Sequence, residues 1–211
     1  MKVKQAWMRT AGAAVALMMV IATGVSAQVG KSQGVMDVNL ASEKDLVSFP
    51  HMTPAIAKAL MAKRPFSSPT ELNAFLLEQK LTAEQAMAFY EKAFVHINLN
   101  TATPAEILLV PGAGRRMVRE FAEYRPWKTW AQFVREIGKY VGAQGAAKLA
   151  QYAFIPMNVN TASDADMLTI QGADQAWVDR VKKGRPYNSI ASIPELEKNA
   201  GKTQARFFVL Q

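Results

Sequence analysis

Two glycines and three arginines lie close together near the middle of this 211-residue chain. Gly112-Ala113-Gly114 is followed directly by Arg115 and Arg116, and Arg119 comes about one helical turn later. Glycine permits positive φ and leaves no side chain between the backbone and an approaching group. The first N–H groups of a following helix would be unpaired and would lie at the positive end of its dipole. The sequence therefore predicts an anion site that contacts phosphate groups without reading a base sequence.

Several other residues are weaker candidates for the same kind of contact. In a similar turn further along the chain, Gly172 keeps the place of the first glycine, but Asp174 replaces the second. We expect Asp174 to cap the next helix and to place its negative charge where a phosphate would bind. The other weak candidates are four lysines, one in a glycine-rich turn and three nearer the end of the chain: Lys139, Lys182, Lys183 and Lys202.

The residue inventory argues against catalysis. The chain has no Cys and two His, which are His51 and His96. A thiol nucleophile is therefore excluded, and a metal site built on histidines is not expected. The acidic residues are scattered without paired spacing. We therefore expect a protein that is not an enzyme and that has no catalytic residue, no metal, no cofactor and no small-molecule substrate.

Two landmarks recur along the chain at a constant offset of 60 or 61 residues, which is the mark of a repeated structural unit. The first is an asparagine before a helix start, which we expect to form a hydrogen bond in the local turn, and the second is an Arg-Pro-aromatic sequence. They occur at Asn39, Asn100 and Asn160, and at Arg64-Pro65-Phe66, Arg125-Pro126-Trp127 and Arg185-Pro186-Tyr187. The spacing divides the chain into a first repeat at 37–96, a second at 97–156 and a third at 157–211.

Each repeat reads as about four short helices, so the predicted fold is all-α. A capping residue opens each repeat at Ser42, Thr103 or Ser163, and an acidic side chain follows three residues later. We expect first helices at 43–48, 104–109 and 164–169, and second helices at 54–63, 115–124 and 175–183. The proline of each Arg-Pro-aromatic sequence ends the second helix, so we assign that sequence a structural role. The remaining helices are expected at 69–77, 82–93, 130–137, 143–152, 194–199 and 202–209.

The beginning of the chain predicts export. Residues 1–27 combine basic residues, an apolar stretch and the small-residue sequence Val25-Ser26-Ala27, a pattern typical of a secretory signal peptide. Residues 28–36 read as a linker. We expect a periplasmic or extracellular location after cleavage. The apolar stretch is shorter than the roughly 20 residues of a membrane span, and the alternative is an uncleaved anchor, which would be the only contact with a membrane.

Positive charge is concentrated in the second repeat. Its residues 97–156 carry eight basic and four acidic side chains, whereas residues 28–96 carry seven of each and residues 157–211 carry seven basic and six acidic. A localised positive field favours a polyanionic partner. A solvated basic surface is the alternative interpretation.

Three segments of the second repeat resemble the helix-hairpin-helix domain of the ComEA type, the DNA receptor of bacterial competence systems. These segments are 100–106, 110–114 and 123–127. The resemblance extends over most of 37–211, once per repeat, and implies non-specific binding of double-stranded DNA through the Gly-x-Gly hairpin. It is weakest in the first repeat, where His51-Met52-Thr53 stands in the place of Gly-x-Gly.

Two functions remain open from the sequence. The first is an exported, non-enzymatic protein that binds duplex DNA through the second repeat, in DNA uptake or competence. The second is a scaffold that binds an envelope protein and has largely lost contact with DNA, because two of the three hairpins depart from the pattern.

Overall fold

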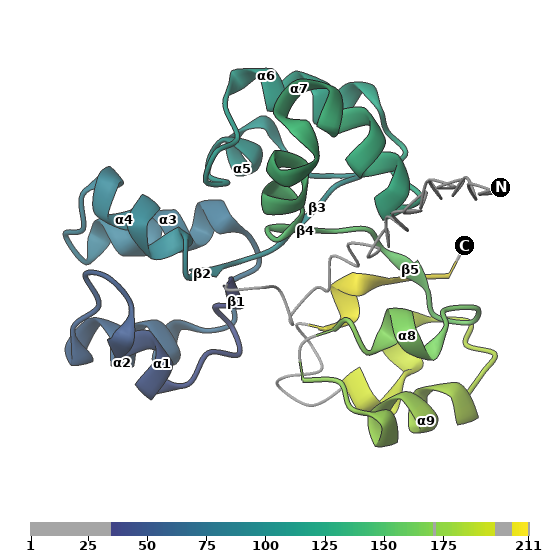
Figure 1. The fold of residues 1–211 in the computed structure, drawn as a ribbon. Helices are drawn as coiled ribbons and strands as arrows, with labels where there is room; N and C mark the ends of the chain where they lie inside the picture. The colour runs from purple at the N-terminus through teal and green to yellow at the C-terminus, as the bar shows by residue number, and fades with distance from the viewer. Residues whose placement is uncertain (1–34, 171, 197–203, 211) are drawn as a thin grey trace, which may run out of the picture.

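The computed structural model describes residues 35–170, 172–196 and 204–210. The predicted signal peptide and the candidate Lys202 lie outside these residues. The described residues are mainly helical, as the sequence predicts. Figure 1 shows the helices in three groups, α1–α4, α5–α7 and α8–α9, arranged around short strands.

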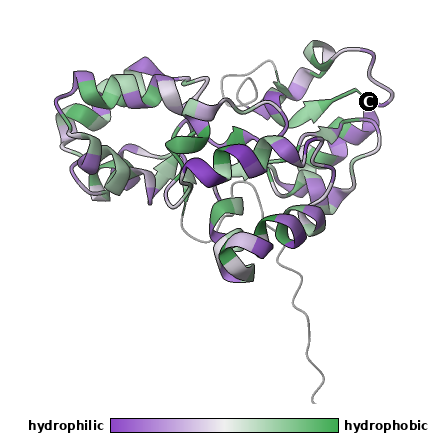
Figure 2. Cartoon of the chain, turned by 90° about the horizontal axis from the view of Figure 1, so that it is seen from above, coloured by the Kyte–Doolittle hydropathy of each residue, from purple (hydrophilic) through white to green (hydrophobic). Residues whose placement is uncertain are grey.

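The first two repeats contain the expected helices with small differences in length. Their bounds are α1 (Glu43–Ser48), α2 (Pro54–Lys63), α3 (Pro69–Glu78), α4 (Ala83–Tyr90), α5 (Pro104–Leu108), α6 (Arg115–Glu123) and α7 (Trp130–Ala150). The two helices expected in this stretch are present as the two parts of α7, which are separated by the non-helical residue Gly142, where φ is 71° and ψ is 167°. Hydrophilic and hydrophobic residues are interspersed along the helices (Figure 2), as expected for helices that bury one apolar side.

The third repeat is less helical than predicted. It begins as expected with α8 (Asp164–Met167) and α9 (Gln175–Lys183). Of the helices expected at 194–199 and 202–209, residues 194–196 and 205–207 form 3-10 turns and residues 208–209 form a strand, whereas residues 197–203 lie outside the described part. The 3-10 turns are η1 (Ile190–Ser192), η2 (Pro194–Leu196) and η3 (Ala205–Phe207). The extended Phe208 that follows η3 ends any helix there, because it lies in strand β6.

Each repeat is closed by a pair of two-residue parallel strands. The strand at the start of a repeat pairs with the strand at its end: β1 (Met36–Asp37) with β2 (Ala93–Phe94), β3 (Ile97–Asn98) with β4 (Ala153–Phe154), and β5 (Met157–Asn158) with β6 (Phe208–Val209). Residues of the segments 95–97 and 154–156, which join one repeat to the next, belong to these strands, and the strands are too short to carry a clear sequence signal.

The capping boxes predicted at the repeat starts are confirmed. Ser42, Thr103 and Ser163 each accept a hydrogen bond from the backbone N–H three residues later, and the acidic side chain at that position bonds back to the N-cap. These reciprocal bonds satisfy two of the otherwise unpaired donors of each first turn. They begin the first helix at the same place in every repeat.

An asparagine lock joins the two sequence landmarks of each repeat. In the second repeat, Asn100 Nδ2 donates to the carbonyl oxygen of Trp127 at 3.0 Å, and the Trp127 N–H donates to Asn100 Oδ1 at 2.6 Å. The same two bonds join Asn39 with Phe66 and Asn160 with Tyr187. The asparagines were expected to stabilise only a local turn. They bind residues 27 positions away, which holds the aromatic ring in the core.

The arginine of each Arg-Pro-aromatic sequence is also structural. Arg125 Nη2 donates to the Ala102 carbonyl oxygen at 2.6 Å, and Arg64 and Arg185 make the equivalent bond to Ala41 and Ala162. The peptide bond to the following proline is cis in all three repeats. These arginines therefore bind the loop that precedes the first helix.

The apolar core is continuous across the first two repeats, and a second core fills the third. Phe94 and Tyr152 meet edge to face with ring centroids 5.4 Å apart, which joins the first repeat to the second. Trp127 is 1% exposed and Trp177 is 6% exposed, so both pack in the core. Trp130 is half-buried and packs against both cores.

A buried polar cluster connects the first and third repeats. Arg206 Nη2 donates to the His96 carbonyl oxygen at 2.9 Å and lies 3.6 Å from Asp37 Oδ2. His96 Nδ1 lies 3.8 Å from the same carboxylate oxygen. Burial raises the pKa of Asp37, but the hydrogen bond with His96 and the attraction of Arg206 outweigh it, so the pKa is below its ordinary value. His96, a junction residue, is packed as expected.

Candidate nucleic-acid interface

The predicted anion site is the turn between α5 and α6. Gly112 has a φ of 83°, in the region that favours glycine, whereas Gly114 has a φ of −84° and a ψ of −178°. Only Gly112 therefore needs glycine for its backbone angles, which corrects the expectation for Gly114. A Cβ added to either glycine would meet no atom within 4 Å. Both glycines face open space, and nothing in the described structure blocks the approach of a ligand.

The three equivalent turns share a backbone conformation but differ at the residue that starts the second helix. His51 and Gly172 take the place of Gly112, with φ values of 62° and 82°. In the first repeat Thr53 caps α2, accepting from the Ile56 N–H at 3.2 Å. In the third repeat Asp174 caps α9, accepting from the Trp177 N–H at 2.7 Å.

Gly114 leaves α6 without a side-chain cap. The Met117 N–H bonds to the Gly114 carbonyl oxygen at 2.9 Å. The N–H groups of Arg115 and Arg116 come before it, in the part of a helix where N–H groups have no carbonyl partner within the helix. They lie at the positive end of the helix dipole, where an anion is favoured. The first turn of α6 also contains no acidic residue. This helix start is therefore the one that fits a phosphate among the three described turns.

The arginines of α6 project from the same helix but differ in their contacts. Arg115 is exposed. The Arg116 guanidinium lies 4.6 Å from the centroid of the Tyr140 ring, and its Nε is 3.9 Å from Glu120 Oε1. Arg119 donates to the same oxygen from Nε at 3.2 Å and from Nη2 at 2.7 Å. The predicted residues thus lie together, and two of the three arginines are held by a carboxylate.

Glu120 is a site residue that sequence reasoning missed. Its side chain is 1% exposed, although it lies among charged neighbours. The hydrogen bond from Arg119 holds the pKa of its carboxyl below the ordinary value, against the effect of burial. The spacing of four residues from Arg116 was an available signal, because side chains at that spacing meet on one helix face.

The first half of α7 extends the basic surface. Lys139, a weak candidate, forms an ion pair with Glu136, and Arg135 Nε donates to Glu136 Oε1 at 2.7 Å. Lys139 also lies 5.5 Å from the centroid of the Tyr124 ring. The Tyr124 and Tyr140 hydroxyls are 3.1 Å apart, which joins the end of α6 to α7. That contact is the largest cause of the raised pKa of Tyr140, so Tyr140 stays neutral.

The weak candidates of the third repeat do not gather into a site. Gly172 lies in the turn before α9, whereas Lys182 and Lys183 lie in the last turn of that helix. Lys182 Nζ is 2.6 Å from Asp164 Oδ1. A helix of nine residues is about 13 Å long, so these lysines and the turn cannot contact one phosphate together.

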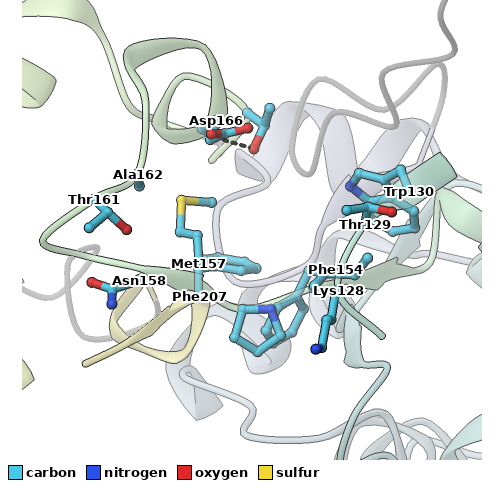
Figure 3. Close-up of a pocket in the computed structure, with 13 residues that line it drawn as sticks. Lys128, Thr129, Trp130, Phe154, Met157, Asn158, Thr161, Ala162, Asp166 and Phe207 are labelled. Carbon is cyan, nitrogen blue, oxygen red and sulfur yellow. Dashed lines mark hydrogen bonds between the residues drawn. The ribbon is translucent and has the colours of Figure 1, made fainter. Parts of the chain in front are cut away.

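A cleft of about 460 Å³ lies between the second and third repeats. Figure 3 shows Trp130 and Lys128 on one side, Asn158 and Thr161 on the other, and Met157 between them. None of the predicted phosphate contacts lines this cleft. The half-buried Trp130 lines the cleft together with Phe154 and Phe207, and the other walls mix polar and apolar groups.

The described part of the chain contains neither a cluster of metal ligands nor a helix that could span a membrane. Within residues 35–170, 172–196 and 204–210, no group of three or more His, Asp or Glu side chains could hold a metal ion. No helix in the same residues is long and apolar enough to cross a membrane.

Comparison with known proteins adds one distant similarity. The chain is 26% identical over 133 residues to a Xenopus laevis protein described as "Endonuclease/exonuclease/phosphatase family domain-containing protein 1". The match covers 48% of this chain and 24% of the frog protein, so the chain spans about a quarter of that relative. No protein-family model matches the chain, and no solved structure matches it.

Proposed function

We propose that this chain is an exported, non-enzymatic protein that binds double-stranded DNA without sequence preference, with a role in DNA uptake. In this proposal the repeats are tandem helix-hairpin-helix domains of the ComEA type. The phosphate contacts come from the second repeat, through the backbone of 112–116 and the side chains of Arg115, Arg116 and Arg119.

The observation that carries the proposal is the open start of α6. Three turns share one backbone conformation, and α6 alone among their second helices starts at a residue without a capping side chain. The arginines follow directly in the repeat that also holds the largest net positive charge. Backbone N–H groups and guanidinium groups at one helix start are the components of a phosphate site.

The frog relative is compatible with this proposal. Its printed description includes endonuclease, an activity on nucleic acid. We propose that the shared segment supplies nucleic-acid contact, and we transfer no catalytic activity to this chain.

The test is a fluorescence anisotropy titration of the purified protein with a labelled random-sequence duplex at several salt concentrations. Each neutralised phosphate contributes about 0.9 to the slope of log K against log salt. Three arginines therefore predict a slope of about −2 to −3 and equal binding of unrelated sequences. The double substitution Arg115→Ala with Arg116→Ala should remove most of the binding and leave the circular dichroism spectrum unchanged.

The alternative function is a scaffold for an envelope protein. The side-chain caps of α2 and α9 favour it, because they occupy two of the three possible phosphate sites. If the wild-type protein fails to bind duplex DNA at about 50 mM salt, the DNA proposal is wrong. A stoichiometric protein partner that survives nuclease treatment would then support the scaffold.

A further inference from the structure

Two buried carboxylates lie under the basic surface of the second repeat. Glu120 on α6 is 1% exposed and Glu136 on α7 is 9% exposed, whereas the cations that contact them are mostly exposed. Each carboxylate is shared by two cations: Arg116 and Arg119 for the first, and Arg135 and Lys139 for the second. Each group of three side chains therefore keeps one net positive charge at the surface.

Packing alone does not account for these carboxylates. At the offset that separates the repeats, Glu120 corresponds to Ala59 and Arg180, and Glu136 corresponds to Phe75 and Leu196. The first repeat thus packs its equivalent helices without an acid at either position, and in the third repeat the equivalent positions, on α9 and in the 3-10 turn η2, also hold no acid. A buried carboxylate is costly unless it is paired, and an apolar replacement is often neutral or stabilising. The acids are present in the repeat that also has the uncapped hairpin.

The ion pairs restrict the motion of the cationic side chains but leave these side chains exposed. Arg119 uses Nε and one side of Nη2 to bind Glu120, which leaves its Nη1 donors directed elsewhere. The Arg119 side chain is 69% exposed. Arg116 is held between the Tyr140 ring and Glu120. Fixing a long side chain before binding reduces the conformational entropy lost in the complex.

We propose that Glu120 and Glu136 are positioning residues that hold Arg116, Arg119, Arg135 and Lys139 as a preorganised basic band across α6 and α7, along which a duplex phosphate backbone lies. This role rests on the proposed DNA binding and deepens it. It adds Arg135 to the contact surface and extends the footprint from the hairpin to the neighbouring helix. It also assigns the two acids a favourable effect on the binding of an anion, which is opposite to the effect of their charge alone.

The positioning role and simple charge repulsion predict opposite changes in DNA affinity when an acid is removed, and this difference provides the test. In Glu120→Met an apolar side chain of similar size replaces the carboxylate, and the net charge rises by one. We expect duplex binding to weaken by about fivefold or more, because two arginines must then be ordered on binding. Glu120→Gln keeps an oxygen that accepts from Arg119 and should recover part of the loss. Glu136→Leu should act as Glu120→Met does.

The matched control is Glu123→Met, which removes the same charge from an exposed position on the same helix. It should bind DNA as tightly as the wild type or more tightly. Hydrogen exchange of the Arg119 Nε–H, followed by NMR without DNA, gives a second measurement. It should be slow in the wild type and in Glu123→Met, and faster in Glu120→Met.

The outcomes separate the two proposals. Weaker binding by Glu120→Met, with no loss in Glu123→Met, would support the positioning role. Equal or tighter binding by both variants would show that the carboxylates only repel DNA, and the positioning role would be overturned while the proposed function stands. Failure of the wild-type protein to bind would overturn both.

Discussion

Replacing Gly114 with aspartate would convert the open helix start of the second repeat into the capped start of the third. The substitution reproduces Asp174, whose Oδ1 accepts from the Trp177 N–H at 2.7 Å. Gly114 has extended backbone angles that any residue adopts, and a Cβ there meets nothing within 4 Å. We therefore expect the variant to fold without strain, to be more stable than the wild type and to bind DNA less well.

The size of both effects follows from the local geometry. Aspartate in place of glycine at an N-cap adds a few tenths of a kcal/mol, and its charge at the start of α6 adds about 0.3 to 1 kcal/mol. A total near 1 kcal/mol corresponds to a rise in melting temperature of about 2–4 °C for a chain of this size. Against a phosphate about 4 Å away, the same charge costs about 1–4 kcal/mol. Duplex binding should therefore weaken roughly fivefold or more.

Thermal unfolding by circular dichroism and duplex anisotropy measure the two effects separately. The matched control is Thr53→Asp, which adds one negative charge to the equivalent turn of the first repeat. It should change DNA affinity by less than about twofold, because that turn is not a proposed contact. A Gly114→Asp variant that binds DNA like the wild type would refute the phosphate site. A variant that melts at a lower temperature would refute the account of the cap.

Two further predictions concern the fold. Asn100→Ala removes both hydrogen bonds of the asparagine lock to Trp127 and should lower the free energy of unfolding by about 2 kcal/mol in urea titrations. Asn100→Asp keeps the acceptor and should lose less stability. An alanine variant as stable as the wild type would contradict the lock. The pKa of Asp37 is lowered in the folded state, so its contribution to stability is present above the unfolded value near 3.9 and is lost as the pH falls through the folded value. Asp37→Asn should therefore lose less stability than the wild type as the pH falls. A melting temperature that falls with acid as steeply as in the wild type would contradict that assignment.

Local signals in the sequence were sufficient for the helices of the first two repeats. Capping residues and prolines act on adjacent backbone, so Thr103, Thr82 and Pro104 mark helix starts that the structure contains. The helix prediction for the described residues in the second half of the third repeat was wrong. The stretch with helical spacing of apolar residues was short there, and Phe208 takes part in strand β6. Strands of two residues depend on a partner about 55 residues away and leave no periodic pattern.

The backbone turn and the charged residues of the candidate site were predictable from the sequence, but the contact between its two helices was not. Gly112 and the arginines of α6 are adjacent in sequence, so their convergence needs only a turn and a helix. The Arg116–Glu120 pair follows from a spacing of four residues on α6, whereas the contact of Arg116 with Tyr140 depends on how α6 packs against α7. The asparagine lock could have been predicted, because the asparagine and the aromatic residue are 27 positions apart in every repeat.

The parallel pairing of the short strands determines how one repeat leads to the next. The strand that opens a repeat and the strand that closes it run side by side in the same direction. The chain therefore leaves a repeat travelling as it entered, and β3 begins three residues after β2 ends. This arrangement is a head-to-tail joint that can be copied without reversing the polypeptide. Duplication of a gene segment could lengthen such a chain by whole repeats, and single copies could then lose or keep a ligand site independently.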